Sequence, residues 1–275
     1  MRIEFTKMQG LGNDFAVFDA PGAAALDGEV IRRLADRHTG IGFDQALVLE
    51  PPRNTDAAVF YRIFNADGLE VEQCGNGARC IAALLAARGL ARSGAVTMDS
   101  PAGLIRARIL QGGRISVDMG PVRFEPRSLP FDARAQARRY SLELAGESVE
   151  IGAVSIGNPH AVLAVESVEA AAVERLGPAI EGHPRFPKRV NAGFMQIVDR
   201  THIRLRVYER GAGETLACGT GACAAVAVGR YWGQLDCDVH VSVRGGELRV
   251  NWNGPEENIW LTGAAEVSFA GHVEV

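Results

Sequence analysis

The chain has 275 residues, of which 47% are hydrophobic and 23% charged, and its formal net charge is -4. This length suits one large globular domain or two smaller ones, and we expect two. A slightly acidic chain lacks the basic surface that binds nucleic acid or anionic membranes. Its longest apolar stretches, 80–87 and 222–229, are far shorter than the roughly 20 residues that cross a bilayer. Neither kind of partner is expected.

The N-terminus and the cysteines indicate a cytoplasmic protein. The opening residues, MRIEFTKMQG, are not followed by an apolar block with a small-residue cleavage site, so no secretion signal is predicted. Five cysteines are an odd number, which does not suggest a disulfide scaffold. We therefore expect reduced thiols, whose reactivity is of more interest than cross-linking.

The first half of the chain predicts a short strand, two helices and a hairpin. After a possible cap at Asp27, apolar side chains recur at helical spacing at Val30, Ile31, Leu34 and Ala35. Segment 81–87 is apolar almost all round, which is typical of a helix buried on every side. Segments 104–110 and 114–119 flank two glycines and predict a β-hairpin.

The second half predicts a similar series. Ser167 is a possible cap for a helical segment that contains Leu176 and ends at Gly177-Pro178. Segment 222–228 is again apolar all round, and segments 239–243 and 247–250 predict a second hairpin. Each apolar helix needs sheet around it, because no face of it is suited to water.

Three landmarks recur in the same order at nearly one spacing. Gly12-Asn13 returns as Gly157-Asn158, Gln45-Ala46 as Asn191-Ala192, and Phe64-Asn65 before Cys74-Gly75 as Tyr208-Glu209 before Cys218-Gly219. Such a series indicates duplication. We predict an α+β fold of two similar, pseudo-symmetric domains, each a curved, mostly antiparallel sheet wrapped around a central buried helix. The boundary is expected near Gly120-Pro121.

The sequence around Cys74 and Cys218 favours chemistry at sulfur. In both halves the cysteine precedes Gly-x-Gly and the start of a buried helix, so its sulfur lies near free backbone N–H groups and the positive helix end. Such a setting can lower a thiol pKa from its usual value near about 8.5. The glycines also let the backbone present N–H groups to an anion such as a carboxylate. Two cysteines facing one cleft would form a two-base site that inverts a stereocentre without a cofactor.

Other roles for these residues were weighed. Cys80, Cys223 and Cys237 are expected to be structural, because a cysteine is commonly just a small buried apolar residue. A zinc or redox site lacks the short Cys-x-x-Cys spacing, and a nucleotide site lacks the third glycine. We expect no metal ligand.

The two halves also differ at two positions. Phe15 in the first half corresponds to His160 in the second, and Asn65 corresponds to Glu209. A two-base enzyme needs one thiolate and one thiol at any moment. We hypothesise that His160 and Glu209 adjust the coupled titration of the cysteine pair.

These motifs resemble the diaminopimelate epimerase family over essentially the whole chain. The resemblance rests on residues 7–15, 42–45, 64–68 and 72–80 in the first half, and on 157–162, 190–194, 208–215 and 217–221 in the second. It implies a pyridoxal-independent isomerase that interconverts LL- and meso-2,6-diaminopimelate through Cys74 and Cys218, in lysine and peptidoglycan precursor synthesis. The implied site lies in the cleft between the domains.

The resemblance also implies roles for further residues. The reacting carboxylate would be held by Gly75, Asn76, Gly219 and Thr220. The amino groups and distal carboxylate of the substrate would meet Asn13, Gln45, Asn65, Asn158, Asn191, Glu209 and Arg210. By the same resemblance the C-terminal tail returns to the first domain, which gives domains of 1–119 with 264–275 and of 120–263, and the protein is a homodimer that uses no cofactor.

Two other functions remain open from the sequence. A proline or hydroxyproline racemase would share the fold and the two cysteines, but its substrate has only one amino-acid end. A non-catalytic amino-acid-binding protein would close on its ligand without using the thiols. Hydrogen exchange at the α-carbon of the ligand distinguishes these possibilities.

Overall fold

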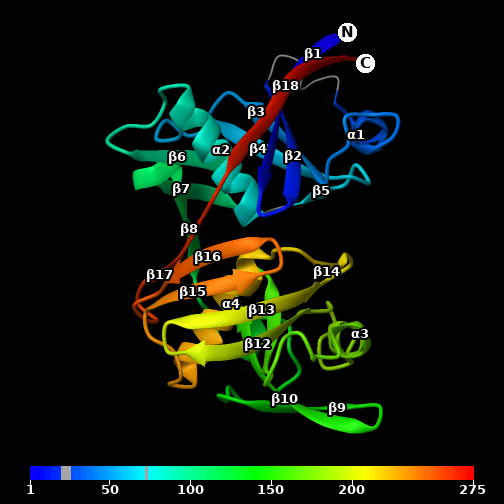
Figure 1. Ribbon diagram of the computed structural model, residues 1–275, viewed down its shortest axis with the longest axis vertical. Helices are drawn as coiled ribbons and strands as arrows, with labels where there is room; N and C mark the ends of the chain where they lie inside the picture. The colour runs from blue at the N-terminus through cyan, green and yellow to red at the C-terminus, as the bar shows by residue number, and fades with distance from the viewer. Residues whose placement is uncertain (20–25, 72–73) are drawn as a thin grey trace. The chain divides into compact units, whose positions relative to one another are not determined.

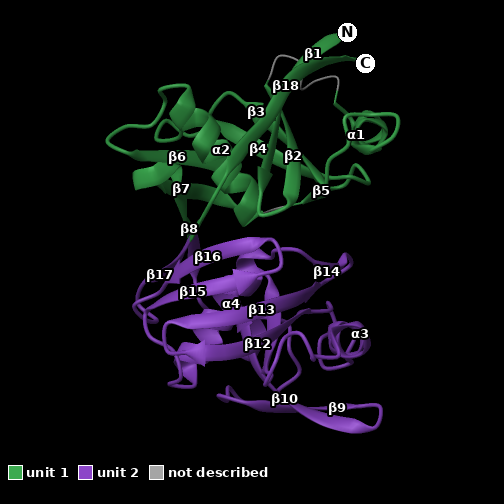
Figure 2. Cartoon of the chain, in the orientation of Figure 1, with its two compact units in different colours: residues 1–118, 262–275 green, residues 119–261 purple. Residues whose placement is uncertain are grey.

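The computed structural model describes residues 1–19, 26–71 and 74–275. The chain divides into two compact units, which Figure 2 shows in different colours. Unit 1 comprises Met1–Asp118 and Thr262–Val275, and unit 2 comprises Met119–Leu261. The chain therefore leaves unit 1, builds unit 2 and returns.

Unit 1 combines a β-sheet with helices, as Figure 1 shows. Its elements are β1 (Arg2–Gly10), β2 (Asn13–Asp19), α1 (Gly28–Ala35), β3 (Gln45–Glu50), β4 (Phe60–Asn65), β5 (Glu70–Val71), α2 (Gly75–Ala87), β6 (Ala95–Ser100), β7 (Gly103–Ile109), the 3-10 turn η2 (Gln111–Gly113), β8 (Ile115–Pro121) and β18 (Glu266–Glu274). The returning β18 pairs antiparallel with β1, with Arg2 opposite Glu274. The first and last strands of the chain thus close the same sheet.

Unit 2 repeats this plan. Its elements are the 3-10 turn η3 (Pro126–Ser128), β9 (Tyr140–Leu144), β10 (Glu147–Ser155), β11 (Pro159–Ala164), α3 (Val173–Glu181), β12 (Asn191–Asp199), β13 (His202–Glu209), β14 (Gly213–Thr215), α4 (Gly219–Tyr231), β15 (Asp238–Val243), β16 (Gly246–Asn251) and β17 (Asn258–Gly263). Both predicted hairpins are confirmed, as β7–β8 and β15–β16.

The strand registers of the two units correspond. In unit 1 the parallel pair β2–β3 sets Phe15 opposite Gln45, and in unit 2 the parallel pair β11–β12 sets His160 opposite Asn191. Each second strand of these pairs then continues into an antiparallel partner, β4 or β13. The predicted α+β fold of two similar units is confirmed.

The central helices are α2 and α4. Helix α2 packs against β1, β2, β6 and β7, and α4 packs against β10, β11, β12 and β16. All but two residues of α4, Arg230 and Tyr231, are buried. A helix with no polar face is buried on all sides, so the strands packed around it determine where its N-terminus lies. Each candidate cysteine immediately precedes one of these helices.

The outer helices α1 and α3 differ in how well their ends were predicted from the sequence. Helix α1 begins after Asp27, whose carboxylate accepts from the backbone N–H groups of Glu29 and Val30, as predicted. The expectation for Gly177-Pro178 was wrong, because α3 begins only at Val173 and runs through both residues. A Cβ at Gly177 would lie 2.6 Å from the Tyr208 ring, so this glycine permits close packing instead of ending the helix.

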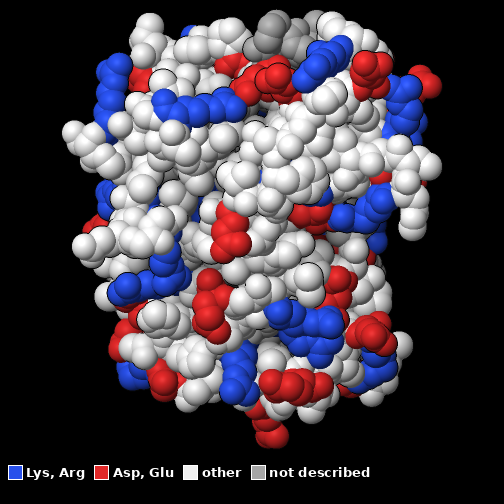
Figure 3. All heavy atoms as spheres, turned by 45° about the horizontal axis from the view of Figure 1, so that its top comes forward, with Lys and Arg blue, Asp and Glu red and all other residues white. Residues whose placement is uncertain are grey.

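The surface and the helix lengths add two observations. On the face shown in Figure 3, acidic and basic side chains are interspersed. None of the helices in the described ranges is both long and apolar enough to span a membrane.

Candidate active site

Cys74 forms the N-cap of α2 in unit 1. Its backbone is extended, with φ -143° and ψ 112°, and its sulfur accepts a hydrogen bond from the N–H of Gly77 at 3.4 Å. The sulfur also lies 3.8 Å from Oδ1 of Asn13, to which a thiol can donate. The Cys74 sulfur therefore has a donor that suits a thiolate and an acceptor that suits a thiol.

The other first-half candidates form two hydrogen-bonded pairs, Asn76 with Asn13 and Gln45 with Asn65. Asn76, on the first turn of α2, is buried and donates from Nδ2 to Oδ1 of Asn13 at 3.2 Å. Gln45 donates to Oδ1 of Asn65 at 2.8 Å. The Oε1 atom of Gln45 is buried without a hydrogen-bond partner among the described residues. The structure thus brings Asn13 and Asn76 together beside Cys74 at the N-terminus of α2, where Gly75 begins the helix, and pairs Gln45 with Asn65.

Cys218 occupies the corresponding N-cap position before α4 in unit 2. Its thiol donates to Oε2 of Glu209 at 3.1 Å, and Thr215 donates to the other carboxylate oxygen. The sulfur also lies 3.6 Å from Oγ1 of Thr220. A Cβ at Gly221 would be 3.2 Å from this sulfur, so the glycine after Thr220 leaves the sulfur the room it needs.

Burial and the Glu209 carboxylate together set the pKa of the Cys218 thiol. Burial, followed by the nearby Glu209 carboxylate, raises the thiol pKa well above its usual value. Burial also raises the pKa of Glu209, although hydrogen bonds from Thr215 and Cys218 oppose that rise. The Glu209 carboxylate therefore disfavours the Cys218 thiolate, whereas the Cys218 thiol, as a hydrogen-bond donor, favours the Glu209 carboxylate, and the two groups titrate together.

His160 and Asn158 lie behind Thr220. The His160 Nε2 atom is 2.9 Å from Oδ1 of Asn158, and Nδ2 of Asn158 donates to Thr220 at 3.3 Å. Burial, and then the positive charge of Arg210, lowers the pKa of His160 to about 3. His160 is therefore neutral at physiological pH, and hydrogen bonds link it to Cys218 through Asn158 and Thr220.

Asn191 and Arg210 form the rest of the second-half group. Asn191 donates to the carbonyl of Pro159 at 3.0 Å and accepts from the backbone N–H of Arg210 at 2.9 Å. The Arg210 guanidinium donates to the carbonyl of Lys188 at 3.2 Å. Asn191 therefore fixes the turn that carries Arg210.

The remaining cysteines have other surroundings. Cys80 and Cys223 are buried and Cys237 is exposed. Burial raises the pKa of Cys80 to about 12, which keeps it a thiol. Within the described residues, no group of three His, Cys, Asp or Glu side chains is arranged to hold a metal ion. Glu72 and Gln73 of the family-like motif lie outside the described residues.

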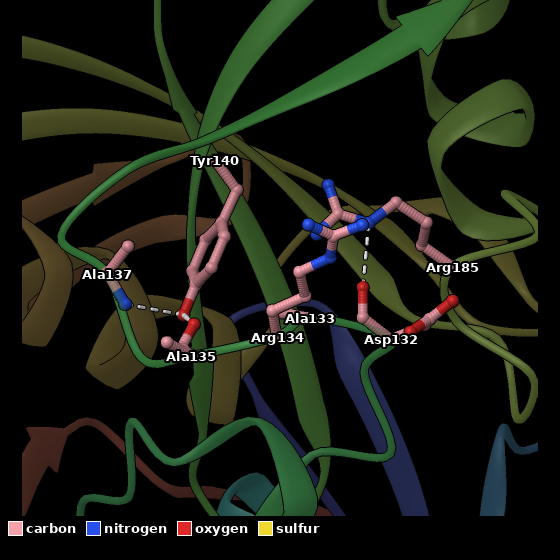
Figure 4. A pocket seen from close by; sticks show the side chains of 7 residues that line it. All are labelled: Asp132, Ala133, Arg134, Ala135, Ala137, Tyr140 and Arg185. Carbon is pink, nitrogen blue, oxygen red and sulfur yellow. Dashed lines mark hydrogen bonds between the residues drawn. The ribbon is translucent and has the colours of Figure 1, made fainter.

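Two features were missed by sequence reasoning. Asp44 directly precedes Gln45 and contacts Asn13. The sequence pointed to Asp44 only through its place in the family-like segment 42–45. Elsewhere in unit 2, Tyr140, Arg134 and Arg185 help to line a hollow that includes none of the candidate residues (Figure 4). The Arg185 Nε donates there to the Asp132 carbonyl at 2.8 Å, which indicates a structural role.

The fold has counterparts among solved structures. Among solved structures, the fold is similar to a probable proline racemase from Agrobacterium radiobacter K84, with a TM-score of 0.73, 19% identity, and coverage of 99% of this chain and 93% of that one. It is also similar to a predicted epimerase from Pseudomonas aeruginosa, with a TM-score of 0.66, 18% identity and 99% coverage of both chains. The chain therefore shares the fold of these two proteins.

Sequence relatives identify the family. The profile of the diaminopimelate epimerase family matches residues 5–125 and 152–268. Diaminopimelate epimerases of Nitrosomonas europaea and Thioalkalivibrio sulfidiphilus are 53% and 54% identical to the chain, each over 100% of both sequences. The chain belongs to the diaminopimelate epimerase family.

Proposed function

We propose that the chain is an isomerase that interconverts LL- and meso-2,6-diaminopimelate by removing the proton from one face of an α-carbon and delivering another proton to the opposite face. Identity above 50% over full length to diaminopimelate epimerases carries this proposal. The small-molecule substrate and the place in lysine and peptidoglycan precursor synthesis follow from that function. The hydrogen-bonding groups around Cys74 and Cys218 suit proton transfer at sulfur.

Cys74 and Cys218 act as opposed bases in this mechanism. One thiolate removes the α-proton from one face of the substrate, and the thiol of the other cysteine delivers a proton to the opposite face. Each sulfur then holds the protonation state that the other had, so the reverse reaction uses the same groups. The surroundings of Cys74, with one donor and one acceptor, suit both states.

The backbone N–H groups at the starts of α2 and α4 stabilise the developing charge. Gly75 and Asn76 with Gly219 and Thr220 bind the reacting carboxylate as negative charge spreads into it. The distal end and the amino groups meet the polar residues Asn13, Gln45, Asn65, Asn158, Asn191, Glu209 and Arg210. Arg210 suits a carboxylate because its guanidinium donates two parallel hydrogen bonds.

His160 and Glu209 adjust the protonation of Cys218 in this proposal. Glu209 takes up or returns the thiol proton across the 3.1 Å contact. Neutral His160 orients Asn158, whose amide reaches the sulfur by way of Thr220.

We further infer that the site lies in a cleft between two domains, one of residues 1–119 with 264–275 and one of residues 120–263. No cofactor or metal takes part in this proposal. The protein is proposed to be a cytoplasmic homodimer.

Proline or hydroxyproline racemization is the alternative that shares the fold. A substrate with two amino-acid ends is favoured by the many polar residues of the site and by Arg210. A direct test incubates the reduced protein with LL-diaminopimelate and, separately, with L-proline, and follows the stereoisomers. Conversion of diaminopimelate alone supports the proposal, and conversion of proline alone overturns the substrate.

A further inference from the structure

The equivalent asparagines of the two units are turned in opposite senses. Asn13 presents Oδ1 toward the cysteine helix, where it lies 3.8 Å from the Cys74 sulfur and accepts from Asn76. Asn158 presents Nδ2 toward its helix, where it donates to Thr220. The helix that follows Cys74 therefore meets an amide oxygen, and the helix that follows Cys218 meets an amide N–H.

A carboxylate determines the direction of Asn13. The Nδ2 atom of Asn13 donates to Oδ2 of Asp44 at 3.0 Å. Since an ionised carboxylate only accepts hydrogen bonds, the Asn13 amide must turn its NH₂ toward Asp44 and its oxygen away. The oxygen then lies beside Cys74.

Asp44 is itself held by neighbouring groups. Its Oδ2 also accepts from the backbone N–H of Asp14 at 3.0 Å, and its Oδ1 accepts from Arg37 at 2.8 Å. Arg37 and Lys7 both bind the Asp14 carboxylate. Burial alone would raise the pKa of Asp14, but the hydrogen bonds from Arg37 and Lys7 outweigh that effect and hold it well below the usual range. Asp44 is therefore held in place by Arg37 and by the backbone of Asp14, whose carboxylate is itself bound by Arg37 and Lys7.

The orienting group changes place between the units. The repeat aligns Asp44 with Val190, a buried apolar residue, because each directly precedes an aligned pair, Gln45-Ala46 or Asn191-Ala192. It aligns Phe15 with His160, and both stand in the same parallel register. Unit 1 thus orients its asparagine from the Asp44 side, whereas unit 2 uses His160.

We propose that Asp44 is a positioning residue that holds the Asn13 oxygen toward Cys74. The Cys74 thiol thereby gains a hydrogen-bond acceptor, whereas the acceptor for the Cys218 thiol is Glu209. The proposal rests on the proposed function only in taking Cys74 as a catalytic residue. Without Asp44, the Asn13 amide can turn its NH₂ toward the sulfur. An N–H donor favours thiolate, so the Cys74 thiol then ionises more readily.

The test measures how fast iodoacetamide alkylates Cys74 between pH 6 and 10, by mass spectrometry of the peptide. The thiolate is the reacting form, so the rate profile reports ionisation without any need for substrate. Asp44→Asn should speed alkylation at pH 7 roughly three- to tenfold, equivalent to a fall of roughly half to one pKa unit. Exposed Cys237 in the same chain serves as the internal standard.

Among the described residues, Tyr61 and Cys80 keep one charge state across the tested pH range. Tyr61 and Cys80 interact electrostatically with Cys74, but burial raises the pKa of both above the tested range. The guanidinium of Arg79, held by Asn76 on the same helix, stays charged throughout. The substitution weakens the ion pair between Arg37 and residue 44, but Lys7 and Arg37 still bind the Asp14 carboxylate.

Two variants separate orientation from simple loss of charge. Asp44→Glu keeps the charge but moves the acceptor, so it should also speed alkylation of Cys74, and it replaces Asp44→Asn if that variant does not fold. In an Asn13→Ala background, Asp44→Asn should have no further effect.

Three outcomes would overturn the proposal: an unchanged profile in Asp44→Asn, wild-type behaviour of Asp44→Glu, or a full Asp44→Asn effect without Asn13. Failure of the wild-type protein to convert diaminopimelate would overturn the proposed function but leave this alkylation result standing.

Discussion

Glu209 determines the behaviour of Cys218 at the scale of single residues. Burial raises the Cys218 thiol pKa most, and the Glu209 carboxylate raises it further by its charge and by the hydrogen bond that it accepts. Glu209→Gln removes the charge, so the Cys218 pKa should fall, although burial still keeps it high. We expect alkylation of Cys218 at pH 8 to quicken several-fold, and epimerization to slow by about 100-fold or more, because a proton acceptor is lost.

Glu214 provides a matched control for this change. It lies on the neighbouring β14, but its carboxylate pairs with Arg206 instead of Cys218. Glu214→Gln should leave the Cys218 alkylation profile unaltered. Equal effects of the two substitutions would show that Glu209 acts through general charge or folding.

His160 predicts a pH dependence of stability. Its pKa falls from 6.5 to about 3 on folding, because burial disfavours the charged imidazole. The contribution of neutral His160 to the free energy of unfolding is therefore complete above pH 6.5. It is lost as the pH falls toward 3, by about 1.4 kcal/mol per pH unit. His160→Gln should remove this slope from the free energy of unfolding, measured in urea between pH 5 and 7. Parallel pH profiles for the two proteins would contradict the assignment of a buried neutral His160.

The sequence predicted some features of the site at this scale but not others. The repeat was enough to align Cys74 with Cys218 and Phe15 with His160, because spacing along the chain survives duplication. It could not predict the roles of Asp44 or Thr215, since these depend on which way side chains turn at the end of a strand. Glu209 was expected to influence the cysteines, but only coordinates give its contact with Cys218.

At the scale of elements, close packing around α4 makes a sharp prediction. A Cβ at Gly152 on β10 would lie 2.4 Å from the Cγ1 atom of Val228, whereas one at Gly193 on β12 would have its nearest neighbour at 3.6 Å. Gly152→Ala should lower the free energy of unfolding by about 1–3 kcal/mol through overpacking. Gly193→Ala should change it by only about 0.5 kcal/mol.

A second substitution tests the cause. Val228→Ala on α4 removes the methyl groups that an alanine at position 152 would meet. The double variant Gly152→Ala/Val228→Ala should therefore be more stable than the sum of the two single effects predicts. Simple additivity would mean that Gly152 is needed for another reason.

Local signals predicted some elements well and others poorly. The cap at Asp27 and the glycines of the two hairpins act within a few residues, so α1, β7–β8 and β15–β16 could be placed from sequence. Helix α3 could not, because the packing of Gly177 on Tyr208 involves residues far apart in the chain. That tertiary contact overrides the usual helix-ending tendency of Gly-Pro.

At the scale of the whole molecule, two similar units supply unlike halves of one proposed site. Cys74 has partial exposure and a neutral acceptor, whereas Cys218 is buried against a carboxylate. If both thiols of one chain serve one substrate, Cys74→Ala and Cys218→Ala should each abolish epimerization, by at least about 1,000-fold. A mixture of the two variants should stay inactive, and recovery of activity on mixing would place the two thiols of a site on different chains.

The most direct test of the central claim follows the α-hydrogen itself. Reduced, metal-free protein is incubated with LL-diaminopimelate in heavy water without pyridoxal phosphate, and both the stereoisomers and their deuterium content are measured. The two-base account predicts meso-diaminopimelate with deuterium at the inverted carbon, formed early while the remaining LL substrate is still largely unlabelled. Deuterium entering LL-diaminopimelate as fast as the meso product forms would indicate a single exchanging base, and no exchange at all would contradict the enzyme assignment.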